Sequence, residues 1–172
     1  IQYITIATTS NSTDFGDSTI SAYGGAGCSN GTRGVFGGGY NGSYLDTMDY
    51  ITISPTGNAT DFGNLTVNRY SLSSCSDDTR GLFGGGSSSG VSNVIDYITI
   101  ASTGNATDFG NLTVARNGVA ACSDGTKGVF GTGSAAATVN TIDYVTIQTT
   151  GNATDFGDML TVNNLLASFS GD

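Results

Sequence analysis

Residues 97–110 read YITIASTGNATDFG, and nearly the same sequence stands at residues 3–16, 50–63 and 144–157. The four copies begin at intervals of 47 residues. A fixed period of this length is typical of solenoids, propellers and other arrays of repeated units. The chain of 172 residues therefore predicts one repeat domain rather than several unrelated domains.

Each repeat predicts four short β-strands and no helix. Residues 95–100 alternate apolar and polar side chains and are rich in β-branched residues, as in a half-buried strand. The Asp124-Gly125 pair is a hairpin signal between two further strands. Along this repeat we expect strands at 95–100, 108–114, 118–123 and 127–130, the last one stopped by Gly131. Because Glu is absent and Thr, Ser and Gly dominate, helix formers are scarce.

The repeat resembles the kelch repeat of β-propellers, which places a double Gly after one strand, a Tyr in the next and an Arg before a small-residue strand. The double Gly stands in Val35-Phe36-Gly37-Gly38 and Leu82-Phe83-Gly84-Gly85, and only half of it in residues 129–132. The remaining matches are the tyrosines Tyr50, Tyr97 and Tyr144, the arginines Arg69 and Arg116, and phenylalanines in place of the absent kelch Trp. The stretch TGNATDFGNLTV also resembles kelch-like repeats of phage tail and virion-surface proteins.

The resemblance implies an all-β propeller of about four kelch-like, four-stranded blades in a single domain over residues 1–172. The repeats span approximately residues 3–49, 50–96, 97–143 and, in part, 144–172. The chain starts at a third strand and ends after a first strand, so we expect its ends to meet in a shared or incomplete blade. Alternatively, a second chain supplies the missing strand by strand addition. The last copy departs from the pattern through an inserted Met159, with Asn164 in the Arg position and Ser170 near the Cys position.

Composition excludes several classes of function. The absence of His removes Ser-His-Asp and Cys-His nucleophile systems and His-based metal sites, including copper sites. A formal net charge of −9 disfavours nucleic acid as a partner, because phosphate binding needs a cationic surface. No segment is apolar enough over about 20 residues to predict membrane insertion. Three Cys at equivalent repeat positions read as small core residues rather than as disulfides.

The Asp-Phe-Gly tripeptide recurs in every copy. One interpretation is a ring of carboxylates that holds Ca²⁺, but the spacing does not match a calcium loop. The other, which we favour, is structural: Asp caps a turn and Phe packs between repeats. The positions are Asp14, Asp61, Asp108 and Asp155, followed by Phe15, Phe62, Phe109 and Phe156. We therefore predict neither a metal nor another cofactor.

Cations also recur, at Arg33, Arg80 and Lys127. They read either as a cationic ring that holds an anionic ligand or as ion-pair partners of the repeated acids. Since Asp greatly outnumbers the cations, we expect pairing with Asp14, Asp61 and Asp108.

The segment after the double Gly differs most between copies. In the first copy it contains Tyr40, Asn41, Tyr44 and Asp46. Variable loops on a repeated scaffold are common binding sites, and Tyr with Asn and Asp suits sugar faces and hydroxyls. Alternatively, these loops differ only because exposed positions accumulate neutral sequence changes. These four residues are the candidate ligand-binding loop.

We expect a non-enzymatic propeller at an extracellular or virion surface, because no catalytic constellation breaks the repeat. Its predicted role is structural assembly and attachment, with copies of itself, a glycan or a cell-surface receptor as partners. The alternative is a self-contained, monomeric glycan- or receptor-binding adhesin module.

Overall fold

The computed structural model describes residues 1–165 and 167, and in this part the chain contains strands and no helix. The prediction of an all-β fold is therefore confirmed. The strands are β1 (Gln2–Tyr3), β2 (Thr13–Asp14), β3 (Ala26–Ser29), β4 (Arg33–Gly37), β5 (Thr47–Thr52), β6 (Thr60–Asn64), β7 (Ser73–Ser76), β8 (Arg80–Gly84), β9 (Val94–Thr99), β10 (Thr107–Asn111), β11 (Ala120–Ser123), β12 (Lys127–Ser134), β13 (Thr138–Thr146) and β14 (Thr154–Asp158).

Consecutive strands pair in antiparallel fashion to form one sheet per repeat. The three complete sheets contain β3–β6, β7–β10 and β11–β14, and a two-stranded sheet contains β1 and β2. Strand β12 corrects one expectation, because it does not stop at Gly131 but continues to Ser134 after a register shift between Gly131 and Gly133. The sequence there reads Gly-Thr-Gly instead of Gly-Gly-Gly, and Thr132, at φ 57°, is the residue skipped at the register shift.

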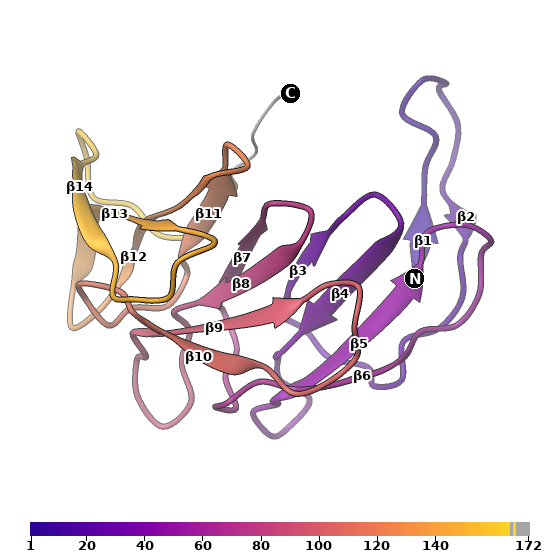
Figure 1. Ribbon diagram of the computed structural model, residues 1–172, viewed down its shortest axis with the longest axis horizontal. Helices are drawn as coiled ribbons and strands as arrows, with labels where there is room; N and C mark the ends of the chain where they lie inside the picture. Colours follow the sequence, from indigo (N-terminus) through magenta and orange to yellow (C-terminus); the bar gives the residue numbers. More distant parts are fainter. Residues whose placement is uncertain (166, 168–172) are drawn as a thin grey trace.

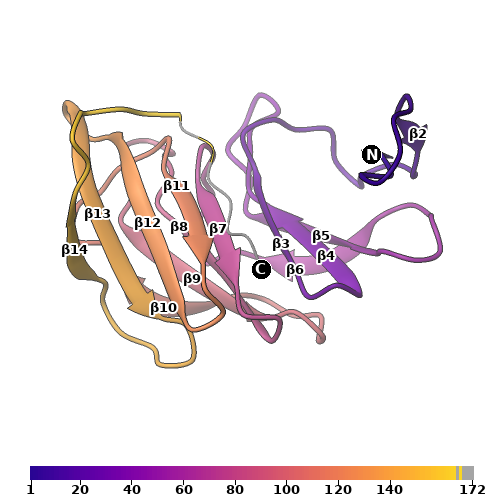
Figure 2. The ribbon, with the colours of Figure 1, turned by 90° about the horizontal axis from the view of Figure 1, so that it is seen from above.

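The sheets lie side by side in an open row (Figures 1 and 2). Strands β3, β7 and β11 form the shared edge, where Ser74 Oγ donates to Gly27 O (2.6 Å) and Ser123 Oγ donates to Ser76 O (2.6 Å). Each of these bonds joins residues 47 positions apart. The described residues do not close a ring, since β1 and β14 lie at opposite ends of the row (Figure 1). Ser170 lies outside the described residues.

The opposite edge of each sheet is locked to the next sheet by a Gly-Asn turn. Asn105 Oδ1 accepts from the Asn64 amide (3.0 Å), and the Ala106 amide donates to Asn64 O (2.8 Å). Gly63 approaches so closely that a Cβ on it would lie 2.5 Å from the Gly104 carbonyl carbon. The same bonds recur one period earlier and one period later, so the repeat sequence encodes the contact between sheets.

Apolar side chains fill the two spaces between the complete sheets. Phe62, Leu65 and Phe83 belong to the first of these cores, and Phe109, Leu112 and Phe130 to the second. Of the repeated phenylalanines, Phe15, Phe62 and Phe109 are buried, whereas Phe156 is 57% exposed because no further sheet packs on β14 in the described chain. The repeated Asp residues lie on strands rather than in turns and are exposed. Among the four, Asp155 alone accepts a bond of the expected local kind, from the Gly157 amide (3.2 Å).

A fully buried ion pair crosses each space between complete sheets. Arg69 Nη2 lies 2.7 Å from Asp96 Oδ2, and Arg116 Nη2 lies 2.9 Å from Asp143 Oδ2, with all four side chains inaccessible to solvent. Burial lowers the pKa of Arg69 and raises the pKa of Asp96, and each partner's charge opposes the other's shift. Thr66 completes the Asp96 site by donating both its amide and its hydroxyl to the carboxylate.

The repeated cations do not pair with Asp14, Asp61 and Asp108, which corrects the prediction. The Arg33 guanidinium lies 4.2 Å from the centroid of the Tyr50 ring and donates to Ile100 O (3.1 Å). Arg80 repeats both contacts one sheet later, and Lys127 keeps the stacking on Tyr144. Each of the two arginines is therefore held by an aromatic face and a carbonyl of the next sheet, and Lys127 by an aromatic face, rather than by a carboxylate.

Replacing Arg69 by Met should lower the free energy of unfolding by about 3–5 kcal/mol, because Asp96 is left as an unpaired buried charge. Replacing Arg33 by Met removes a partly exposed cation–π contact, and we expect a loss of about 1 kcal/mol. Urea denaturation at neutral pH measures both. Equal losses in the two variants would contradict the assignment of the main electrostatic constraint to the buried pair.

Replacing Gly63 by Ala should destabilise the fold by more than about 2 kcal/mol, since the new Cβ meets the backbone of the next sheet at a φ of 139°. Gly57→Ala is the matched control, because a Cβ there meets no heavy atom within 4 Å. Its effect should stay within about 1 kcal/mol. Thermal unfolding of both variants tests whether the contact between sheets is as close as described.

Candidate functional site

The structure brings two of the four predicted loop residues together and adds two others. Tyr40 and Tyr44 have ring centroids 5.1 Å apart, and the Tyr70 ring lies 6.1 Å and 5.6 Å from them. Tyr23 joins from the segment before β3, with its ring 5.7 Å from that of Tyr40. We call Tyr23, Tyr40, Tyr44 and Tyr70 the tyrosine cluster.

The tyrosine cluster is held by backbone pairing and is open to solvent. Tyr40 forms isolated antiparallel bridges with both Tyr23 and Tyr44. Tyr23 is 65% exposed and Tyr44 is 36% exposed. Exposed, preorganised aromatic rings offer flat apolar faces and phenol groups at low entropic cost.

The other two predicted residues serve the loop itself. Asn41 Oδ1 accepts from the Ser43 amide (3.2 Å) and so closes the turn between Tyr40 and Tyr44. Asp46 is half-buried, and its carbonyl accepts from the Leu65 amide (2.7 Å), a contact that Asn93 repeats with Leu112. Asp46 thus belongs to the repeated scaffold and Asn41 to the turn of the loop. Tyr40 and Tyr44 come from the loop that is particular to the first copy, whereas Tyr23 and Tyr70 occupy equivalent positions 47 residues apart.

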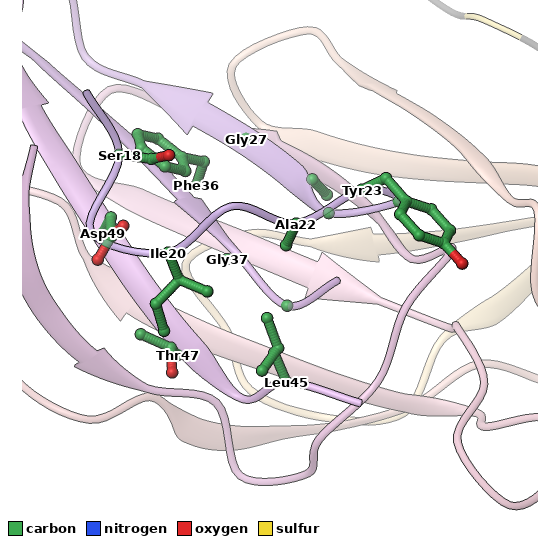
Figure 3. A pocket seen from close by; sticks show the side chains of 14 residues that line it. Ser18, Ile20, Ala22, Tyr23, Gly27, Phe36, Gly37, Leu45, Thr47 and Asp49 are labelled. Carbon is green, nitrogen blue, oxygen red and sulfur yellow. The ribbon is translucent and has the colours of Figure 1, made fainter. Parts of the chain in front are cut away.

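A pocket of about 400 Å³ lies beside the cluster, between the segment before β3 and the strands β4 and β5. Figure 3 shows Asp49 at one end of the pocket and Tyr23 at the other, with Ile20 and Ala22 between them. We call this cavity the Asp49 pocket; Ser18, Ala22, Gly25, Phe36, Thr47 and Asp49 are among its lining residues.

Small side chains create the Asp49 pocket. Counting in steps of 47 residues, Ser18 stands where later copies have Leu65 and Leu112, and Gly25 stands where they have Leu72 and Val119. All four of those apolar side chains are buried in the spaces between the complete sheets. The first copy thus keeps the backbone of the repeat but lacks the side chains that would fill its space.

Asp49 is the buried charged group of the pocket. It is 4% exposed, and Thr19 donates its amide (3.0 Å) and its hydroxyl (2.7 Å) to the carboxylate. The described part of the chain places no Lys or Arg in an ion pair with Asp49. Sequence reasoning missed this residue, although the departures of Ser18 and Gly25 from the repeat were a readable signal.

The cysteines and carboxylates do not assemble a reactive or metal-binding group within residues 1–165 and 167. The three thiols are free, and burial raises the pKa of Cys28 to about 12 and that of Cys75 as well, which disfavours thiolates. No group of three Cys or Asp side chains suited to a metal ion occurs among these residues. The part of the chain that the structure describes contains no helix long and apolar enough to cross a membrane.

Comparison with known proteins gave no relative: no family model matches the sequence, and neither does any curated protein. The site must therefore be interpreted from its own geometry.

Proposed function

We propose that the chain is a kelch-like repeat protein of a virion or other extracellular surface, without a catalytic role, which acts in assembly and attachment. The tyrosine cluster is the attachment surface of this proposal, and carbohydrate is its ligand class. The main support for this proposal is that four tyrosine rings from three separate segments meet at one solvent-exposed edge of the molecule. Aromatic faces stack on the C–H faces of sugars, while phenol groups exchange hydrogen bonds with hydroxyls.

The surface charge agrees with this interpretation. A formal net charge of −9 repels nucleic acid and anionic membranes and leaves neutral sugars and cationic proteins as ligands. None of the four residues of the tyrosine cluster is a cation, so anionic glycans are the disfavoured subset. We also propose that the row of sheets is part of a closed propeller of about four blades. The structure shows the open row.

Assembly has a separate observation in its favour. Phe156 is 57% exposed, although its counterparts Phe62 and Phe109 are buried between sheets, and the nearby Leu160 is fully exposed. Gly157 likewise has open space at its Cα, where Gly63 and Gly110 touch a following turn. This end of the row therefore offers the same surface that elsewhere packs on a sheet. In a second copy of the chain, the exposed Asn11 is the sequence equivalent of the Asn58 and Asn105 that make this contact.

Replacing Tyr40 and Tyr44 together by Ala should weaken binding to any glycan that the wild-type protein retains on a glycan array by at least about tenfold. Tyr3→Ala is the matched control, since this ring is 41% exposed but lies on β1, outside the cluster. Equal retention by the double variant and the wild type would remove the tyrosine cluster from the proposal.

The assembly role predicts discrete oligomers or polymers that survive dilution, measured by native mass spectrometry and light scattering. Phe156→Asp should shift them to monomers, because a carboxylate would be buried in the new contact. Val91→Asp, at a loop residue that is 38% exposed, should leave the mass unchanged. A wild-type monomer near 17 kDa at all concentrations would favour the self-contained adhesin instead.

A further inference from the structure

The Arg69–Asp96 pair shows how this fold holds a buried guanidinium. Arg69 Nη1 donates to Val94 O (2.7 Å), and Nη2 donates to Phe83 O (3.1 Å) and to Asp96 Oδ2 (2.7 Å). Two carbonyls and one carboxylate thus converge on one planar group. Arg116 repeats the contacts to the carboxylate and to the Phe130 carbonyl.

The first complete sheet keeps these acceptors in the same register. Asp49 pairs with Phe36 across β4 and β5, as Asp96 pairs with Phe83 across β8 and β9. Thr47 O accepts from the Gly38 amide (3.1 Å), as Val94 O accepts from the Gly85 amide (3.1 Å). Thr19 holds the Asp49 carboxylate as Thr66 holds Asp96. The backbone and carboxylate that surround Arg69 therefore exist at the Asp49 pocket too.

The arginine is what the first copy lacks. Ala22 stands 47 residues before Arg69, and it is exposed, whereas Arg69 and Arg116 are fully buried. The side chains that would close the space are shortened as well, at Ser18 and Gly25. Three replacements in one copy, all lining one pocket of about 400 Å³, leave the carboxylate reachable from outside through that pocket.

We propose that the Asp49 pocket binds a guanidinium group supplied from outside the chain, the side chain of an arginine being its natural form. The guanidinium bridges Asp49 and the carbonyls of Phe36 and Thr47, and its alkyl stem lies along Ile20 and Leu45, which line the pocket. A planar fork of donors matches acceptors of this kind better than a compact ammonium does. The pocket shares Tyr23 with the tyrosine cluster, but the acceptors that would hold the guanidinium, on Asp49, Phe36 and Thr47, lie outside the cluster.

Chemistry and charge select this ligand over other cations. A metal ion would find one carboxylate, and no group of three ligating side chains occurs in the described chain. The net charge of −9 attracts a cationic segment to the surface. Asp49 itself, 4% exposed, gains its missing counter-ion when the guanidinium enters.

The test is a titration followed by amide NMR shifts and calorimetry with methylguanidinium, against methylammonium and methylurea at equal ionic strength. We expect saturable binding of methylguanidinium with shifts centred on Thr19, Phe36 and Asp49. Methylammonium should bind at least about tenfold more weakly, and neutral methylurea should give no saturable shifts. Absence of saturable binding, or equal binding of methylammonium, would overturn the proposal.

Variants locate the site. Asp49→Asn should weaken methylguanidinium binding at least about tenfold, while Asp158→Asn, an exposed residue at the far end of the row, should not change it. Ala22→Arg should abolish binding and raise the melting temperature, because it restores the side chain that the other sheets contain. If Asp49→Asn fails to fold, the Ala22→Arg variant still decides, since unchanged binding in that variant would contradict the site.

Two probes separate the sources of the guanidinium. A Gly-Arg-Gly peptide amide that binds at least about tenfold more tightly than arginine amide would identify an arginine within a protein segment as the ligand. Equal affinities would assign the pocket to small guanidinium compounds. Glycan binding is measured separately, on the Tyr40/Tyr44 double variant. If that variant binds glycans as the wild type does, the proposed glycan site is wrong, but the result for the Asp49 pocket is unaffected.

Discussion

The buried ion pair that crosses from one sheet to the next is the interaction on which the rest of this structure depends. Arg69 follows the last strand of one sheet and reaches Asp96 in the next, with no exposure of either side chain. The desolvation of two charges is costly, and the bonds from Arg69 to Val94 O, Phe83 O and Asp96 offset that cost only in this relative placement of the sheets, with the Arg69 Nε left without a partner. The ion pair thus fixes the rotation and spacing of neighbouring sheets. The Asn-turn contacts and the serine bonds between sheets recur with the same 47-residue period.

The same constraint explains why the first copy is the place to look for function. Later copies hold their neighbours through a Leu, an Arg and a Leu or Val at three positions, and the first copy loses those contacts because it has Ser18, Ala22 and Gly25 there. The cost of an unpaired Asp49 is reduced by Thr19 but not removed. The first copy therefore contains a cavity lined by the same carboxylate and carbonyl acceptors that hold an arginine in the other copies. The tyrosine cluster, on the same rim, adds a second kind of surface beside it.

Much of the fold is readable from the sequence, because the 47-residue period and the alternation in 95–100 reflect local strand preferences and hairpin turns. The arrangement of the sheets is less accessible. Whether the row closes depends on contacts between its ends, on which the repeat carries no information. Partners of Arg33 and Arg80 were also mispredicted, since a Tyr face and a carbonyl of the next sheet compete with carboxylates only once the sheets are placed.

At the site, the loop of Tyr40 and Tyr44 was visible as a variable segment. The contributions of Tyr23 and Tyr70 required the fold, although the two stand 47 residues apart.

The most direct measurement is a crystal structure of the protein soaked with methylguanidinium, refined with the pocket left empty until the last step. We expect planar difference density between the Asp49 carboxylate and the carbonyls of Phe36 and Thr47, superimposable on the Arg69 guanidinium after a shift of one repeat. Density for ordered water alone in the pocket, or an Asp49 carboxylate turned away from it, would contradict the claim that this sheet retains an arginine site without its arginine.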